Sequence, residues 1–411
     1  MFEIFQKLNM LITVEKEINM KKVVITHAKR TPIGSFNGTL ASLSAPQLGS
    51  TVIKALLDES QIDPKLVDEV IMGNVITAGL GQAPARQAAL FAGLTEKTEC
   101  LTINKMCGSG LKAVMLAHQA ILSGDAEVII AGGQESMSNA PYLLPGARGG
   151  YRLGHGSIQD SILVDGLTDA YDNIHMGNCA EATAKKCNMT REELDAFAVL
   201  SYNRAIAAQK EGKFNDEITG VKIKSKAGET IVLKDEEPEK VNFDKIPSLR
   251  PAFDKSGIVT AANSSKLNDG ASALLIMSED KAKELGLKPM AEIVAQSSAA
   301  RIPVEFTIAP ADAINKVLAK ANLKTTDIDL YEINEAFAVV SLAVANIIGL
   351  STDNVNVNGG AIALGHPIGA SGARILTTLL YEMKKRKSRY GLAGLCIGGG
   401  EASAVIVKNY E

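Results

Sequence analysis

The stretch Asn104-Lys105-Met106-Cys107-Gly108-Ser109-Gly110 decides how the surrounding chain is interpreted. It precedes a run of helical character at residues 111–123, and the apolar run Val128–Ala131 follows that helix. Glycines beside a cysteine allow close approach of the backbone to a substrate, and N–H groups at a helix start favour a thiolate. The pattern therefore predicts a reactive cysteine at a strand-to-helix turn. The alternative is a small core residue, because free cysteine is among the most buried types.

Composition indicates an ordinary globular chain. Its 411 residues are 46% apolar and 22% charged, which is enough for a large core and two or three domains. A net charge of −3 gives no general attraction to nucleic acid or to an anionic membrane, and no apolar run reaches membrane-spanning length. The five cysteines are an odd number, which predicts reduced thiols. We therefore expect a cytoplasmic protein with neither nucleic acid nor membrane as a partner.

Apolar periodicity predicts an alternation of strands and helices. The expected strands are Val23–Thr26 and Val70–Met72, and the expected helices are 46–59, Pro84–Ala92 and 191–211. Residues 222–245 are an expected hairpin or loop, and the chain returns to core-like composition at Leu267–Met277. Strands separated by helices of this size predict an α/β fold with a mostly parallel sheet covered on both faces.

The last third of the chain repeats features of the first. The pairs are Ala45-Pro46 with Ala309-Pro310, 71–74 with 332–334, 108–110 with 370–372, and 131–133 with 398–400. Each pair is separated by about 260 to 270 residues, which predicts two copies of one βα unit. If the copies face each other, Cys107 of one would lie near His366 and Cys396 of the other.

The repeat and the composition suggest a division of the chain. Residues 1–19 are expected to be an N-terminal appendage ahead of a first strand. Residues 20–138, completed by 268–290, form the first half, and 291–411 form the second. Between them, residues 139–267 are rich in loops and charge, which predicts an inserted loop domain.

Three further positions could carry chemistry with Cys107. His366 lies within the glycine-rich stretch 359–374, Cys396 precedes three glycines, and Asn334 follows a predicted strand. Two cysteines and a histidine suit a reaction in which one sulfur takes an acyl group and a second base removes a carbon-bound proton. A turn histidine, a buried strand cysteine and a Cys–His–Asn hydrolase are the alternatives. The spacing of the cysteines does not fit a zinc site, and the glycine-rich turns do not fit a phosphate loop.

Four blocks in order, Asn104–Gly110, Asn334–Phe337, Gly365–Gly372 and Cys396–Gly400, together resemble the thiolase family, in its acetyl-CoA C-acetyltransferase branch. The resemblance extends from Met20 to the end of the chain. It implies a five-layered α/β/α/β/α core built from two similar halves, with an inserted loop domain. It also implies homodimers or homotetramers.

The resemblance implies a ping-pong reaction that joins two acetyl-CoA molecules to give acetoacetyl-CoA and CoA, or the reverse. Cys107, activated by His366, would carry the acetyl group, and Cys396 would remove the proton from the second substrate. His366 with a water held by Asn334 would form one oxyanion site, and the N–H groups of Cys107 and Gly398 the other. The CoA thioesters are substrates, so no separate cofactor or metal is implied. A cysteine hydrolase or thioesterase using Cys107 and His366, or a degradative 3-ketoacyl-CoA thiolase of broader chain length, remains open.

The resemblance also implies substrate contacts. They are His175, Met176, Leu249, Phe253, Ser265, Ala336 and Phe337. Three positions depart from the family pattern: Glu239 stands where an arginine is frequent, Lys266 where glycine is favoured, and Glu401 where small or uncharged residues are usual. We expect them to affect CoA affinity and, through the carboxylate of Glu401, the basicity of Cys396.

Overall fold

The computed structural model describes residues 21–226 and 228–410. The appendage predicted at residues 1–19 lies outside this range. Within these two ranges, no helix is both long and apolar enough to cross a bilayer.

One ten-stranded sheet runs through the molecule in the order β12-β13-β14-β11-β1-β10-β5-β3-β4, with the short β2 beside β10. Its strands are β1 Val23–Arg30, β2 Gly34–Ser35, β3 Glu69–Gly73, β4 Glu99–Ile103, β5 Val128–Ser136, β10 Asn268–Ser278, β11 Ala291–Ala300, β12 Leu330–Ile333, β13 Tyr390–Ile397 and β14 Glu401–Asn409. The two halves have the same plan: β3 and β5 correspond to β12 and β13, and β10 and β1 correspond to β14 and β11. They join where β1 pairs with β11 at Val24↔Glu292 and Ile25↔Ala291.

The sheet is mixed, so the prediction of a mostly parallel sheet is wrong. β3 runs parallel to β4 and β5, and β12 runs parallel to β13, but β10 and β14 return antiparallel beside β5 and β13. The physical reason is the connection: the tight glycine turn 398–400 can join β13 to β14 only as an antiparallel pair. A parallel neighbour would need a crossover segment.

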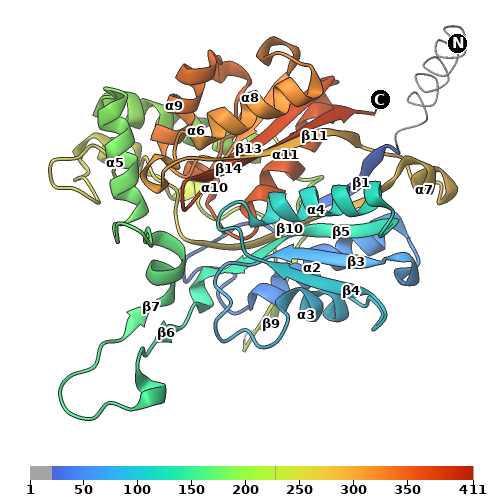
Figure 1. Ribbon diagram of the computed structural model, residues 1–411, viewed down its shortest axis with the longest axis horizontal. Helices are drawn as coiled ribbons and strands as arrows, with labels where there is room; N and C mark the ends of the chain where they lie inside the picture. Colours follow the sequence, from blue (N-terminus) through green and yellow to red (C-terminus); the bar gives the residue numbers. More distant parts are fainter. Residues whose placement is uncertain (1–20, 227, 411) are drawn as a thin grey trace, which may run out of the picture.

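Helices cover and separate the two halves of the sheet (Figure 1). The principal ones are α2 Ala45–Ser60, α3 Pro84–Phe91, α4 Ser109–Ser123, α8 Ala309–Ala321, α9 Ala338–Ile348 and α11 Ser371–Arg386. α2 and α3 pack on the outer face of one half, α8 and α9 pack on the other half, and α4 and α11 lie between the halves in one shared apolar core. This is the five-layered arrangement that the family resemblance implies. Pro46 and Pro310 stand in the first turns of α2 and α8, as the internal repeat predicted.

The close contact between α4 and α11 depends on two glycines. A Cβ atom on Gly110 would lie 2.8 Å from the backbone nitrogen of Ala373, and one on Gly372 would lie 2.4 Å from that of Leu111. Only glycine permits so close an approach of two helix starts. Cys107 precedes one of these helices and His366 precedes the other, so this packing brings the two side chains to one place.

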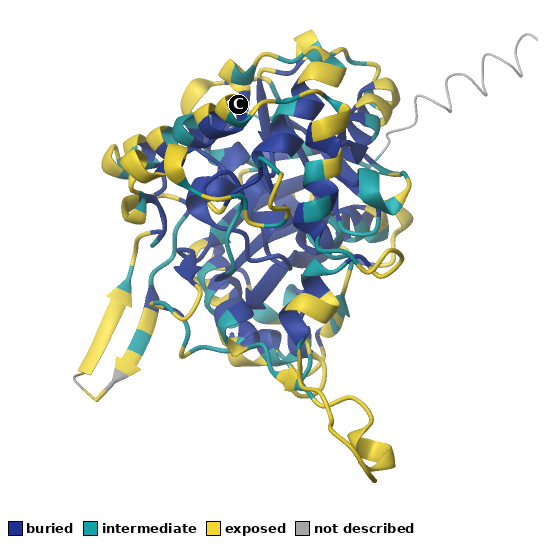
Figure 2. Ribbon diagram, turned by 90° about the vertical axis from the view of Figure 1, so that its left-hand side faces the viewer, coloured by how far each residue is buried: buried dark blue, intermediate teal, exposed yellow. Residues whose placement is uncertain are grey.

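The segment between the halves contains α5 Met176–Lys186 and α6 Arg191–Lys210, as well as the hairpins β6 Tyr142–Leu143 with β7 Gln159–Asp160 and β8 Val221–Ser225 with β9 Gly228–Val232. The helix and hairpin predicted here are observed, while the domain boundaries stay a prediction. Both hairpins project from the body as mostly exposed arms (Figure 2). The remaining helices are α7 Glu279–Glu284, α10 Ala361–Leu364 and short 3₁₀ or π turns at Pro64–Leu66, Met137–Asn139, Ala147–Gly149, Ile162–Leu167, Pro238–Lys240, Phe243–Ser248, Pro303–Glu305, Thr325–Asp327 and Thr352–Asn354.

Candidate active site

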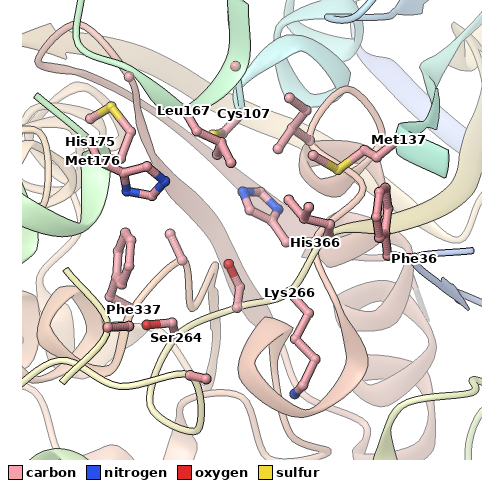
Figure 3. Close-up of a pocket in the computed structure, with 18 of the residues that line it drawn as sticks. Phe36, Cys107, Met137, Leu167, His175, Met176, Ser264, Lys266, Phe337 and His366 are labelled. Carbon is pink, nitrogen blue, oxygen red and sulfur yellow. The ribbon is translucent and has the colours of Figure 1, made fainter. Parts of the chain in front are cut away.

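A cavity of about 540 Å³ lies where the two halves and the inserted segment meet (Figure 3). Nine predicted site residues line it: Cys107, His175, Met176, Phe253, Ser265, Ala336, Phe337, His366 and Gly398. Leu249 does not line it. This residue directly follows the short helix Phe243–Ser248, where its N–H donates to the carbonyl of Ile246 at 3.2 Å. The cavity therefore gathers residues from both duplicated halves and from the segment between them.

Cys107 sits on a tight turn that points its side chain into the cavity. Met106 adopts a left-handed φ of 47°, and the hydroxyl of Ser109 joins the turn by accepting from the N–H of Lys105 at 2.8 Å and donating to the carbonyl of Met106 at 2.6 Å. Burial raises the pKa of the Cys107 thiol to about 11, although the backbone N–H groups of Gly398 and Cys107 itself oppose the rise. The expectation of a resting thiolate is therefore corrected, since desolvation outweighs two N–H contacts.

His366 is held in a defined orientation. Its Nδ1 lies 2.6 Å from the Ser371 hydroxyl, which itself donates to the carbonyl of Pro367 at 2.9 Å. The hydroxyl oxygen can then accept from Nδ1–H, which leaves the lone pair of the ring on Nε2. The backbone N–H of His366 donates to Asn268 Oδ1 at 2.9 Å. Burial, assisted by the charge of Arg374, lowers the pKa of His366 to about 3, so the ring is a neutral base at pH 7.

Cys396 is fully buried near the end of β13 and does not itself line the cavity. Burial raises its pKa well above the ordinary value, and the neighbouring Cys107 raises it further. The two sulfurs are therefore close enough to interact, as the facing repeats predicted. Glu401 does not reach this thiol, because its carboxylate pairs with Lys105 and is 40% exposed.

Asn334 is buried directly after β12, beside the imidazole. Its Nδ2 lies 3.5 Å from His366 Nε2. Among the described residues, its Oδ1 has no hydrogen-bond partner. A buried polar atom without a protein partner beside a cavity is a position where an ordered water is expected.

Aromatic and sulfur-containing side chains form the wall around the reacting groups (Figure 3). The ring of His175 stacks on Phe253 with centroids 4.7 Å apart, and Phe253 meets Phe337 edge to face at 6.0 Å. His175 is fixed because its Nδ1 accepts from the N–H of Gly177 at 3.0 Å, at the start of α5. This wall is rigid and apolar, which suits a narrow acyl or pantetheine group.

Charged groups lie toward another part of the cavity lining. Lys240 contacts Glu236 and the Ser35 hydroxyl, both at 2.7 Å, and the ammonium of Lys266 donates to the carbonyl of Ile362 at 3.0 Å. Both lysines line the cavity. Glu239 points elsewhere and accepts from Gln209 at 3.2 Å. Its carboxylate is therefore not part of the lining.

Several lining and supporting residues were missed in the sequence. They are Phe36, Met137, Leu163, Leu167, Phe306, Ile368, Asn268 and Ser371. Ser371 offered a signal, because serine at the start of a predicted helix five residues after a histidine is available to bind it. The apolar residues offered none, since they come from separate segments of ordinary core composition. No group of three or more His, Cys, Asp or Glu in the described ranges could hold a metal ion.

Comparison with known families matches both halves of the chain. Residues 23–280 match the family described as thiolase, N-terminal domain, and residues 287–409 match thiolase, C-terminal domain. The chain is 54% identical over 391 residues to an acetyl-CoA acetyltransferase of Cupriavidus necator, covering 95% of this chain and 100% of the relative. It is 51% identical to a probable acetyl-CoA acetyltransferase of Dictyostelium discoideum, over 95% and 94% of the two chains.

Solved structures show the same fold. The acetyl-CoA acetyltransferase of Bacillus anthracis superposes with a TM-score of 0.93 at 43% identity, covering 95% of this chain and 99% of that one. A thiolase from Ascaris suum in complex with coenzyme A superposes with a TM-score of 0.90 at 44% identity, over 95% and 100% of the two chains.

Proposed function

The chain belongs to the thiolase family, and on that premise we propose that it is an acetyl-CoA C-acetyltransferase. The reaction joins two acetyl-CoA molecules to give acetoacetyl-CoA and CoA, and it also runs in reverse. Support comes from relatives of that name at more than 50% identity along nearly the whole chain. The observation that carries the proposal is the meeting of Cys107 and His366 at one cavity, with the buried Cys396 close enough to Cys107 to feel its charge.

The first half-reaction transfers acetyl to Cys107. His366 Nε2 takes the thiol proton as the sulfur attacks the thioester carbonyl, and the Cys396 thiol gives its proton to the departing CoA sulfur, which leaves His366 protonated and Cys396 as a thiolate. A neutral imidazole with a free lone pair is the form that this step needs. The negative charge that develops on the carbonyl oxygen faces the N–H groups of Cys107 and Gly398.

The second half-reaction forms the carbon–carbon bond. The Cys396 thiolate left by the first half-reaction removes a proton from the methyl group of a second acetyl-CoA, and the resulting carbanion attacks the acetyl carbonyl and releases the Cys107 sulfur, which takes its proton back from His366. Burial that raises the pKa of Cys396 makes its thiolate a stronger base. His366 and a water held at Asn334 Oδ1 stabilise the enolate oxygen.

CoA thioesters are the substrates, and the thioester group itself provides the acidity of the methyl proton. We propose no separate cofactor. The apolar wall of His175, Phe253 and Phe337 accommodates the pantetheine arm. Lys240 and Lys266 supply positive charge for the phosphate groups, which carry several negative charges.

Two cysteine variants separate this function from a hydrolase. After brief exposure to acetyl-CoA, intact mass measurement should find one acetyl group on the wild type and on Cys396→Ala, and none on Cys107→Ala. Cys396→Ala should form no acetoacetyl-CoA, since the base for carbon deprotonation is gone. Cys187→Ala, at the end of α5 and outside the cavity lining, is the matched control and should match the wild type. Free acetate released equally by the wild type and Cys396→Ala would favour the hydrolase instead.

We further propose that the protein is a homotetramer or a homodimer in the cytosol. The arm at residues 142–160 exposes four large side chains with apolar surface, Tyr142, Leu144, Leu153 and Ile158. Exposed apolar surface of this kind is typical of a region that is buried against another protein chain. The five cysteines are free thiols, as is usual in a reducing compartment.

A further inference from the structure

A buried arginine–glutamate pair lies close to the catalytic histidine, and burial raises the pKa of the Glu332 carboxyl to about 8. Arg374 Nη1 of α11 is 3.6 Å from Glu332 Oε2 of β12, and both side chains are 3% exposed. In the described part of the chain, the three guanidinium nitrogens and Glu332 Oε2 have no hydrogen-bond partner. A buried pair with so few hydrogen bonds adds little stability, because the loss of hydration offsets the attraction. Its presence therefore calls for another explanation.

The pair spans the same two elements that hold His366. Residues 332 and 334 are two apart along an extended segment, so they lie on one face, and residues 371 and 374 lie one helical turn apart on one side of α11. Asn334 contacts His366 Nε2 at 3.5 Å, and Ser371 contacts Nδ1 at 2.6 Å. His366 is thus held between β12 and α11, and Glu332–Arg374 forms a second contact between them.

We propose that Arg374 and Glu332 are positioning residues for the acetyl transfer: the pair fixes the spacing of β12 and α11 around His366 and places the Arg374 cation near the imidazole. This proposal rests on the proposed function of Cys107 and His366. It also explains why the guanidinium of Arg374 is buried without a hydrogen-bond partner among the described residues.

The electrostatic part follows from the surroundings of His366. The titratable or charged groups facing it or its loop are Arg374 on α11, Glu332 on β12, Glu335 after β12, Cys107 before α4, Cys396 on β13, Glu135 on β5, and His175, Glu237, Lys240 and Lys266 in the cavity lining. Among these charges, Arg374 is the one that adds to burial in lowering the pKa of His366. A nearby cation disfavours the imidazolium form, so its removal should make the ring easier to protonate.

The test is single-turnover acetylation of Cys107 by acetyl-CoA, followed between pH 5 and 8.5. Arg374→Met should slow acetylation at least about tenfold across this range, because His366 is no longer held in place, and should move the acid limb of the profile toward pH 5, so that the loss is greatest there. Arg374→Lys retains the cation and should retain the wild-type position of that limb. KM for acetyl-CoA should stay unchanged in both, because neither Arg374 nor Glu332 lines the cavity. Lys384→Met, an exposed cation on the same helix, is the control and should match the wild type.

Wild-type rates and pH dependence in Arg374→Met would overturn the proposal, as would an equal loss at every pH accompanied by a higher KM. If Arg374→Met does not fold, Glu332→Asp takes its place. That variant keeps the guanidinium and a carboxyl group but shortens the acid, so slower acetylation with unchanged KM supports the pair, and a wild-type rate contradicts it. Absence of acetylation in the wild type would instead contradict the proposed function, which keeps the two failures distinct.

Discussion

Cys107 and His366 carry no charge at neutral pH, because burial favours the neutral form of each. A cysteine is charged when it loses its proton, so burial raises its pKa, here to about 11. A histidine is charged when it gains a proton, so burial lowers its pKa, here to about 3. The resting site is therefore a thiol facing an imidazole, and charge forms only as substrate reacts.

This state predicts how the free enzyme reacts with iodoacetamide. Since the thiolate is the reactive form, the rate of Cys107 alkylation should rise about tenfold per pH unit between pH 7 and 10. His366 is neutral throughout that range and adds no inflection. The rate is measured by mass spectrometry, with Cys107→Ala correcting for the other cysteines. A plateau below pH 8 would instead indicate a preformed thiolate–imidazolium pair.

At the scale of elements, the contact of α4 with α11 controls the site. The two helices start beside each other because Gly110 and Gly372 lack side chains. Cys107 and His366 stand just before these starts, so their separation depends on how closely the helices approach. The site is therefore sensitive to small changes in packing that touch neither reacting residue.

Gly372→Ala tests this dependence. The added Cβ would meet the backbone nitrogen of Leu111 at 2.4 Å, and neither helix can move without disturbing the shared core. We expect a loss of about 1–3 kcal/mol in the free energy of unfolding together with slower acetyl transfer. Urea denaturation followed by circular dichroism measures the first, and a thiolysis assay measures the second. Gly149→Ala, where a Cβ meets nothing within 4 Å, should leave both unchanged. An equally stable and active Gly372→Ala would show that the helices can separate without consequence.

At the scale of the whole molecule, the five layers form a compact body and the arm at residues 142–160 extends away from it (Figures 1 and 2). Leu153 is fully exposed and Ile158 is 69% exposed. The body does not need the arm for its own core, since the four apolar clusters draw on other segments. The arm is thus available for contact with another copy of the chain.

The double variant Leu153→Asp with Ile158→Asp should form a smaller species than the wild type in analytical ultracentrifugation. The charges would be buried against a partner copy, which is unfavourable, whereas the isolated chain leaves them in water. The circular dichroism spectrum should stay unchanged. Ile231→Asp on the β8–β9 hairpin has a similar exposure of 56% and serves as the control. Unchanged sedimentation of the double variant would exclude the arm as an association surface.

The sequence by itself indicated the duplicated plan and singled out Cys107, His366, Cys396 and Asn334, because these depend on local patterns, whereas the resemblance to thiolases implied the layers and the other lining residues. Proline marks helix starts, and glycines mark tight turns and close contacts. Motif order then indicated which cysteine, histidine and asparagine belong together. These signals lie within short segments and can be read without knowing how distant segments pack.

The tertiary structure alone decided the strand directions, the protonation states and the remaining walls. Sheet direction depended on how β10 and β14 return, and the thiol of Cys107 stays protonated because burial by distant segments outweighs its local N–H groups. Leu249 was predicted to line the cavity and does not, whereas Met137 and Ile368 line it and were not predicted. In each case the physical reason is that segments distant in the sequence meet in space. Their contacts set the strand pairing and the lining of the cavity, and together they set the desolvation of a buried group.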